Sequence, residues 1–158
     1  MTGPRQWLLL MAALCAAAVG AALVAQYGFD MQPCPWCILQ RVIFLMIALL
    51  CVIGVLVKVP ALRKILAGLA LVLAALGGAS AVYQHVVAAK LNSCNLTLAD
   101  KILRALQIES LYPALFEIRG TCADAAVSVL GVPFEYWSLA LFALLAGMAL
   151  RPLIRYAT

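Results

Sequence analysis

The amino-acid sequence predicts an all-α fold: a polytopic membrane four-helix bundle formed by a single domain, residues 1–158, with both termini cytoplasmic and two periplasmic loops. Composition is the first reason, because 67% of the residues are hydrophobic and 11% are charged, whereas a soluble domain carries about 25% charged residues. Four long apolar segments are the second reason. The distribution of charges between those segments is the third.

The apolar segments cover residues 7–26, 38–57, 65–87 and 132–150. A bilayer core of ~30 Å requires roughly 20 residues of helix, and each segment is close to that length. Lipid offers no hydrogen-bond partners to a backbone, so each segment is expected to be helical. The runs are continuously apolar and do not alternate, which is not the pattern of a membrane β-barrel.

The first segment has an alternative interpretation as a signal peptide, because it follows the basic residue Arg5. The apolar stretch is longer than the ~7–15 residues of a signal peptide's apolar region. No convincing cleavage site with small residues precedes Gln26 and Tyr27. We therefore expect this segment to remain in the protein as a true membrane span.

Basic and acidic residues are distributed unequally once both termini are placed in the cytoplasm, although Lys90, Lys101, Arg104 and Arg119 fall on the outer side. The cytoplasmic side then carries six basic residues and no acidic one: Arg5, Lys58, Arg63, Lys64, Arg151 and Arg155. The outer side carries every acidic residue: Asp30, Asp100, Glu109, Glu117, Asp124 and Glu135. This agrees with the positive-inside rule. The net charge of +5 is thereby explained by topology, and no nucleic-acid partner is expected.

This topology creates a short outer loop, residues 27–37, and a long one, residues 88–131. The two loops contain four of the six cysteines: Cys34, Cys37, Cys94 and Cys122. Disulfides persist outside a bacterial inner membrane, and four cysteines allow three pairings. The other two cysteines, Cys15 and Cys51, fall within spans and are expected to be packing residues.

The two groups of outer cysteines differ in character. Cys34 and Cys37 are too close in sequence for a stabilising loop closure, so they indicate metal binding or redox chemistry. A zinc site needs two further ligands at suitable spacing, and the single histidine, His85, forms no ligand pattern. No metal site is therefore expected. Cys94 and Cys122 enclose 27 residues and, taken alone, favour a disulfide that closes the loop.

The start of the second span explains why Cys37 could be reactive. With Cys34 near the N-cap, Pro35 occupies the first helical position, where its missing N–H costs nothing. Cys37 then lies in the first turn, where the positive helix end favours a thiolate. Arg41 is four residues further on the same face. It is either an anchor reaching the interface or a functional cation suited to a carbonyl oxygen of a membrane-dissolved quinone.

These residues resemble the disulfide bond formation protein B family, bacterial inner-membrane thiol oxidases that recharge the periplasmic oxidant disulfide bond protein A. The resemblance rests on Cys34-Pro35-Trp36-Cys37 with Arg41 at the start of the second of four spans, and it covers nearly the whole chain. Further matching stretches are Tyr83-Gln84-His85, Gly120-Thr121-Cys122-Ala123 and Gly131-Val132-Pro133.

The resemblance implies a relay with four catalytic cysteines. A reduced periplasmic partner would attack a Cys94–Cys122 disulfide, and Cys94 would hold the mixed disulfide. Electrons would pass to a Cys34–Cys37 disulfide through a transient Cys34–Cys122 bond. Cys37 would face the quinone and Arg41 would hold a quinone oxygen. The implied cofactor is ubiquinone, with menaquinone as an acceptor under anaerobic conditions.

Two further residues follow from the resemblance. The family's matching histidine is associated with the quinone site, so His85 is a candidate quinone-binding residue. Alternatively, His85 is a histidine at the membrane interface whose hydrogen bonds are made by water. Gln40 departs from the family, in which an acidic residue can precede the arginine; nothing in the implied chemistry requires a carboxylate there.

The long loop also contains an apolar cluster: Leu111, Tyr112, Leu115, Phe116 and Ile118. It indicates either a short amphipathic helix in the interface, which would hold Cys122 near Cys34, or a small core patch under the loop. In the third span, the small residues of Gly77-Gly78-Ala79-Ser80 favour close helix packing.

Three other functions fit parts of the pattern. A vitamin K epoxide reductase-like enzyme also combines four helices with a Cys-x-x-Cys, but on its last helix. An outward electron conduit would need reactive cysteines accessible from the cytoplasm, and Cys15 and Cys51 lack activating neighbours. A non-enzymatic protein stabilised by disulfides leaves the spacing of Cys37 and Arg41 unexplained.

Overall fold

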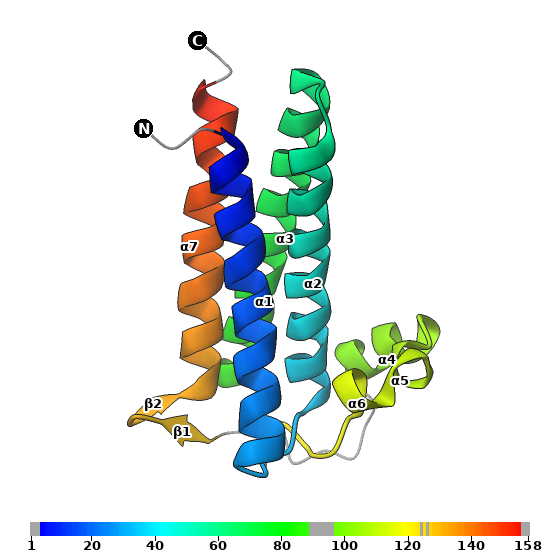
Figure 1. The fold of residues 1–158 in the computed structure, drawn as a ribbon. Helices are drawn as coiled ribbons and strands as arrows, with labels where there is room; N and C mark the ends of the chain where they lie inside the picture. The colour runs from blue at the N-terminus through cyan, green and yellow to red at the C-terminus, as the bar shows by residue number, and fades with distance from the viewer. Residues whose placement is uncertain (1–3, 89–96, 124, 126, 156–158) are drawn as a thin grey trace.

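The computed structural model describes residues 4–88, 97–123, 125 and 127–155, and it confirms the all-α four-helix prediction (Figure 1). The long helices are α1 (Pro4–Gly28), α2 (Pro35–Leu56), α3 (Pro60–Val86) and α7 (Phe134–Arg155). Each is long and apolar enough to cross a membrane. Between α3 and α7 lie α4 (Leu98–Ala105), α5 (Ile108–Leu111), α6 (Pro113–Phe116), β1 (Ser128–Val129) and β2 (Val132–Pro133).

The helix ends differ from the limits of the apolar segments. The helices α2 and α3 begin at Pro35 and Pro60, ahead of the apolar segments, because proline is favoured in the first helical turn. Val132 and Pro133 were expected to open the fourth span, but they form β2 and pair with β1. Leu130 and Gly131 have φ angles of 55° and 79° and turn the chain between the two strands.

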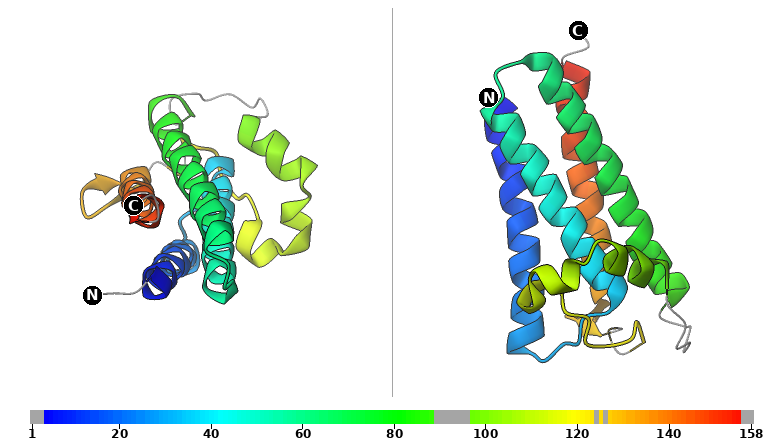
Figure 2. Two further views of the ribbon diagram at one scale, coloured as in Figure 1. Left: turned by 90° about the horizontal axis from the view of Figure 1, so that it is seen from above. Right: turned by 90° about the vertical axis from the view of Figure 1, so that its right-hand side faces the viewer.

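The bundle has two chemically distinct ends. The start of α1, the end of α7 and the connection between α2 and α3 lie at one end, whereas α4–α6 and the β-hairpin lie at the other (Figure 1). Helix α3 packs chiefly on α7, and α2 packs on both α1 and α3. The short helices α4–α6 form an arc beside α2, on the side away from α7 (Figure 2).

The core of the bundle contains stacked aromatic rings and small residues. Phe44 and Phe142 lie face to face, with ring centroids 4.1 Å apart and an interplanar angle of 2°. Gly77 of α3 packs directly against the Phe142 ring, which a Cβ atom at this position would overlap. Cys15 and Cys51 are fully buried in the same core, in agreement with a packing role.

The apolar cluster of the long loop is divided between two four-residue helices, because Pro113 begins a new helix. Phe116 is buried and packs with Ile38 of α2 and Leu103 of α4. Leu111 and Tyr112 are 78% and 61% exposed. The loop therefore forms the small core patch against the start of α2, and it also exposes apolar side chains; a single amphipathic helix is not formed.

A candidate redox site beside an apolar cavity

The cysteine motif lies at the start of α2, as the sequence indicates. Cys34 is the N-cap residue in an extended conformation, its sulfur accepts a hydrogen bond from the Cys37 N–H at 3.4 Å, and Pro35 begins the helix. The Sγ atoms of Cys34 and Cys37 are 2.9 Å apart, and both residues are free thiols. The helix start therefore holds the two sulfurs close enough to exchange electrons as a dithiol–disulfide pair.

Cys122 of the long loop lies against this pair. Cys34 forms side-chain hydrogen bonds with both Cys122 and Cys37, and the three residues share an apolar cluster with Trp36. The loop is held there by its backbone, since the N–H groups of residues 119 and 120 donate to the Pro33 carbonyl at 3.1 and 3.3 Å. The structure thus places one buried sulfur, that of Cys34, between two others.

Burial raises the pKa of the Cys34 thiol well above its usual range, and its hydrogen bonds with Cys122 and Cys37 act in the same direction. The pKa of the Cys122 thiol is lowered, chiefly by its hydrogen bond with Cys34, although burial opposes this. Cys122 is therefore the sulfur that loses its proton more readily. The thiolate is the nucleophile in disulfide exchange, so in the reduced site Cys122 is the more nucleophilic of these two cysteines.

Cys94 lies outside the described residues, so its pairing with Cys122 remains a prediction. Within the described part of the chain, no group of three or more His, Cys, Asp or Glu residues could hold a metal ion.

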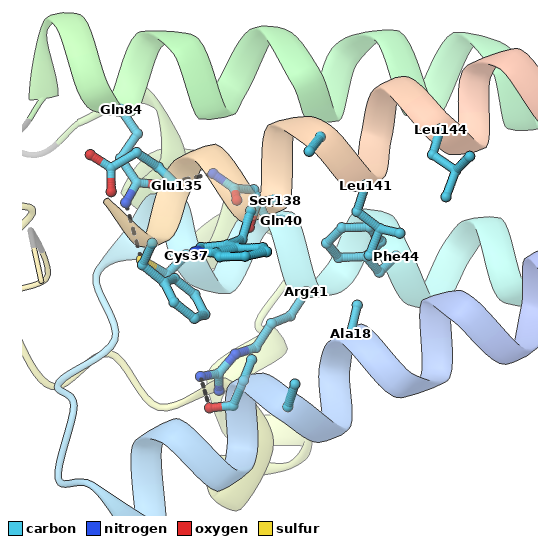
Figure 3. Close-up of a pocket in the computed structure, with 15 residues that line it drawn as sticks. Ala18, Cys37, Gln40, Arg41, Phe44, Gln84, Glu135, Ser138, Leu141 and Leu144 are labelled. Atoms are coloured by element: carbon cyan, nitrogen blue, oxygen red, sulfur yellow. Dashed lines mark hydrogen bonds between the residues drawn. The ribbon is translucent and has the colours of Figure 1, made fainter. Parts of the chain in front are cut away.

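A cavity of about 410 Å³ adjoins the cysteine motif and is enclosed by α1, α2, α3 and α7 (Figure 3). Cys37 lines this cavity, whereas Cys34 does not. The walls away from the sulfur are alanines of α1 and the side chains of Phe44, Leu141 and Leu144. The volume falls within the range of about 300–1,000 Å³ that is typical of ligand sites.

Two glutamines connect the cavity to the Cys37 sulfur. Gln84 Nε2 donates to Cys37 Sγ at 3.3 Å, and Gln40 Nε2 donates to Gln84 Oε1 at 2.8 Å. Both glutamines are buried, and Figure 3 shows them at the same end of the cavity as Cys37. No role for Gln84 is predicted from the sequence, although its position beside His85 near a span end was an available signal.

Arg41 lies at the polar end of the cavity but turns toward α1. Its guanidinium donates to Gln26 Oε1 at 2.6 Å, to the Leu115 carbonyl at 3.1 Å and to the Ala22 carbonyl at 3.2 Å. The residue is only 5% exposed, and its Nε has no hydrogen-bond partner among the described residues. Arg41 therefore joins α1, α2 and α6 inside the protein and does not extend to the surface as an anchor.

His85 is placed next to the cavity by an acidic residue. Its Nδ1 lies 2.7 Å from Glu135 Oε1, and Glu135 lines the cavity while His85 does not. The sequence analysis assigned Glu135 only to the outer acidic residues. Its place at the start of an apolar span was the signal that could have identified it, since a carboxylate there is costly to bury.

Sequence comparison relates nearly the whole chain to known proteins. The family model described as disulfide bond formation protein DsbB matches residues 4–151. Disulfide bond formation protein B 1 of Pseudomonas syringae pv. syringae (strain B728a) is 36% identical over 154 residues, which cover 96% of this chain and 90% of the relative. The protein of the same name from Pseudomonas aeruginosa (strain PAO1) is 29% identical over 163 residues, 99% of either chain. No solved structure gave a significant match.

Proposed function

We propose a specific thiol-oxidising function for this chain, which belongs to the disulfide bond formation protein DsbB family. Family membership makes it a membrane disulfide oxidoreductase, in a family that is known to use a quinone. Our proposal is that it reoxidises a periplasmic thioredoxin-like dithiol oxidant, disulfide bond protein A, and passes the electrons through two cysteine pairs to ubiquinone, or to menaquinone under anaerobic conditions.

One observation carries the proposal: the Cys34 sulfur contacts both Cys122 of the loop and Cys37 of the cavity. Electrons that arrive at the loop can therefore reach the cavity by two successive disulfide exchanges, without a large movement of the described residues.

The exchange steps balance with the four cysteines alone. The partner's dithiol reduces a Cys94–Cys122 disulfide through a mixed disulfide at Cys94, and the partner leaves oxidised. The Cys122 thiolate then attacks Cys34 of a Cys34–Cys37 disulfide and releases Cys37 as a thiolate. Cys94 attacks Cys122, re-forms the loop disulfide and leaves Cys34 as a thiol. Two electrons have then moved from the loop to the Cys34–Cys37 pair.

The cavity fits a quinone headgroup and the beginning of its tail. A bound quinone supplies the two-electron sink for the Cys34–Cys37 pair. Arg41 places a cation with a buried, unpartnered Nε at the polar end, and Gln84 keeps the Cys37 sulfur oriented toward the cavity. Phe44, Leu141 and Leu144 provide apolar walls suited to the ring and tail of a quinone. His85 contributes through Glu135, as argued below.

The charge distribution supports an orientation with the cysteine site in the periplasm. All six basic residues assigned to the cytoplasm belong to the end of the bundle opposite α4–α6. We therefore propose a multi-pass protein of the bacterial inner membrane with both loops at the periplasmic face.

Cysteine substitutions in the purified protein test the relay. Reduction of ubiquinone by a reduced disulfide bond protein A should be abolished by serine at Cys34, Cys37, Cys94 or Cys122. It should persist with serine at Cys15 or Cys51, which lie in the core away from the site. Titration of the protein with quinone, followed by absorbance of a thiolate–quinone complex, should give a signal that requires Cys37. Full quinone turnover by Cys37→Ser would contradict the proposed function.

A further inference from the structure

Glu135 is a buried carboxyl group with one oxygen left without a partner. The residue is 3% exposed, its Oε1 lies 2.7 Å from His85 Nδ1, and its Oε2 has no hydrogen-bond partner within the described structure. Burying a carboxylate without full hydrogen bonding is costly. Oε2 is therefore available to a group in the cavity for a hydrogen bond or a proton transfer.

Glu135 stands between two cavities. It lines the 410 Å³ cavity together with Cys37, and it also lines a smaller cavity of about 60 Å³ between α3 and α7 with His85 and Tyr136. In Figure 3 its side chain lies at the end of the main cavity where Gln84 and Cys37 are gathered. The carboxyl group of Glu135 thus lies between His85 and the main cavity, which Cys37 lines.

His85 connects this carboxyl group to the outside of the protein. Its side chain is 38% exposed, and the residue lies in the last turn of α3, at the end of the bundle that carries the cysteines. Its ring packs on Tyr136 at 4.7 Å between centroids, which limits its orientation. A histidine can exchange protons with water near neutral pH, so the pair joins the surface to the cavity by a single hydrogen bond.

We propose that His85 and Glu135 form a proton path into the main cavity, with Glu135 Oε2 as the proton donor at its inner end. The inference rests on the proposed function and adds the source of a proton to it. Formation of the Cys34–Cys37 disulfide from one thiol and one thiolate releases two electrons and one proton. Reduction of a quinone to a quinol takes up two electrons and two protons, so one proton is missing. Glu135 supplies the missing proton, His85 returns one to it, and water outside recharges His85.

The other groups facing Glu135 do not offer an equivalent path. On α2 these are Cys37, Gln40 and Arg41, and Arg41 is engaged by α1 and α6. On α3 they are Gln84 and His85, and on α7 they are Tyr136, Trp137 and Ser138; the amide of Gln84, the indole of Trp137 and the hydroxyl of Ser138 are not acids of useful strength. The part of α1 that lines the cavity consists of alanines. Among the described cavity residues, the carboxyl group of Glu135 is therefore the acid best placed to give up a proton.

The variant Glu135→Gln tests the path, because it keeps the shape and hydrogen bonding of the side chain but removes the acid. Glu117→Gln is the matched control, since Glu117 is an exposed carboxylate paired with Arg119 on the outer loop. Binding of ubiquinone-1, followed by quenching of tryptophan fluorescence, should be nearly unchanged in both. Oxidation of the reduced cysteines by ubiquinone-1 in a single turnover should slow by about 100-fold in Glu135→Gln only, the scale of a lost general acid.

Two further measurements support the test. The first does not depend on turnover, and the second does not depend on the folding of Glu135→Gln. Infrared difference spectra of quinone binding should contain a band from a protonated carboxyl group that Glu135→Gln abolishes and Glu117→Gln retains. His85→Ala should also slow the single turnover, and added imidazole should restore it. Unaltered single-turnover rates in both Glu135→Gln and His85→Ala would overturn the path while leaving the relay intact. Loss of ubiquinone-1 binding in Glu135→Gln would also overturn it, because the carboxyl group would then act in binding.

Discussion

At the scale of single residues, the sulfur of Cys34 lies between the sulfurs of Cys37 and Cys122. It is fully buried, it is hydrogen-bonded to Cys37 and Cys122, and its pKa is raised by that burial. Cys122 has the opposite shift, with its pKa lowered chiefly by Cys34. One hydrogen bond thus makes the two neighbouring thiols of the reduced protein unequal in acidity.

This inequality predicts the pH dependence of labelling in the reduced protein. Because the pKa of Cys122 is lowered, the Cys122 thiolate persists below the ~8.5 of a free cysteine. Alkylation of Cys122 by a small reagent should therefore begin at lower pH than alkylation of a peptide thiol, and alkylation of Cys34 should begin at higher pH. Mass spectrometry of the labelled peptides measures both. In Cys34→Ala the Cys122 profile should move to higher pH; an unshifted profile would show that Cys34 is not the cause.

At the scale of the elements, the close packing of α3 against α7 requires that residue 77 has no side chain. The Phe142 ring fills the space where a Cβ would lie, while it also stacks on Phe44 of α2. This contact brings together three of the helices that enclose the cavity. The sequence predicted a small-residue face in this span, but only the structure shows which glycine is required.

Alanine substitutions at two glycines of α3 test this contact. Gly77→Ala should lower the free energy of unfolding by about 1–3 kcal/mol, the usual cost of overpacking. Gly68→Ala is the matched control, since no atom lies within 4 Å of a Cβ there, and alanine in a helix interior is favoured over glycine by roughly 0.5–1 kcal/mol. Thermal unfolding of the purified protein in detergent distinguishes them. Equal stability of the two variants would contradict the close packing of Gly77 on Phe142.

For the whole molecule, the two ends of the bundle differ in charge and in chemistry. One end carries the short connection between α2 and α3, with basic residues and no acidic one, and the other carries residues of both signs, the cysteine motif, the buried Glu135 and the exposed apolar side chain of Leu111 in α5 (Figure 1). This polarity supports a single orientation in the membrane, with chemistry at one face only.

Labelling of introduced cysteines checks that orientation in a chain whose own cysteines are replaced. Leu106→Cys, 61% exposed after α4, should react with a membrane-impermeant maleimide in intact spheroplasts. Val59→Cys, 56% exposed between α2 and α3, should react only after the membrane is disrupted. The reverse pattern would place the cysteine site in the cytoplasm.

The sequence by itself determined the parts of this protein that depend on local properties. Continuous apolar runs identify the four helices, since lipid accepts no other backbone arrangement for them, and Pro35 with Cys37 identifies the reactive helix start. Motif resemblance identified the family. These inferences need only the chemistry of residues close together in the chain.

Only the tertiary structure decided what the motif contacts. Cys34 meets Cys122, and His85 meets Glu135, although 88 and 50 residues separate them in sequence. Gln84 reaches Cys37 across a separation of 47 residues. Such contacts depend on the backbone bonds that hold the long loop to Pro33 and on the packing of α3 against α7. Neither periodicity nor composition encodes these distances, because they arise when the packed helices and the loop bring distant residues together.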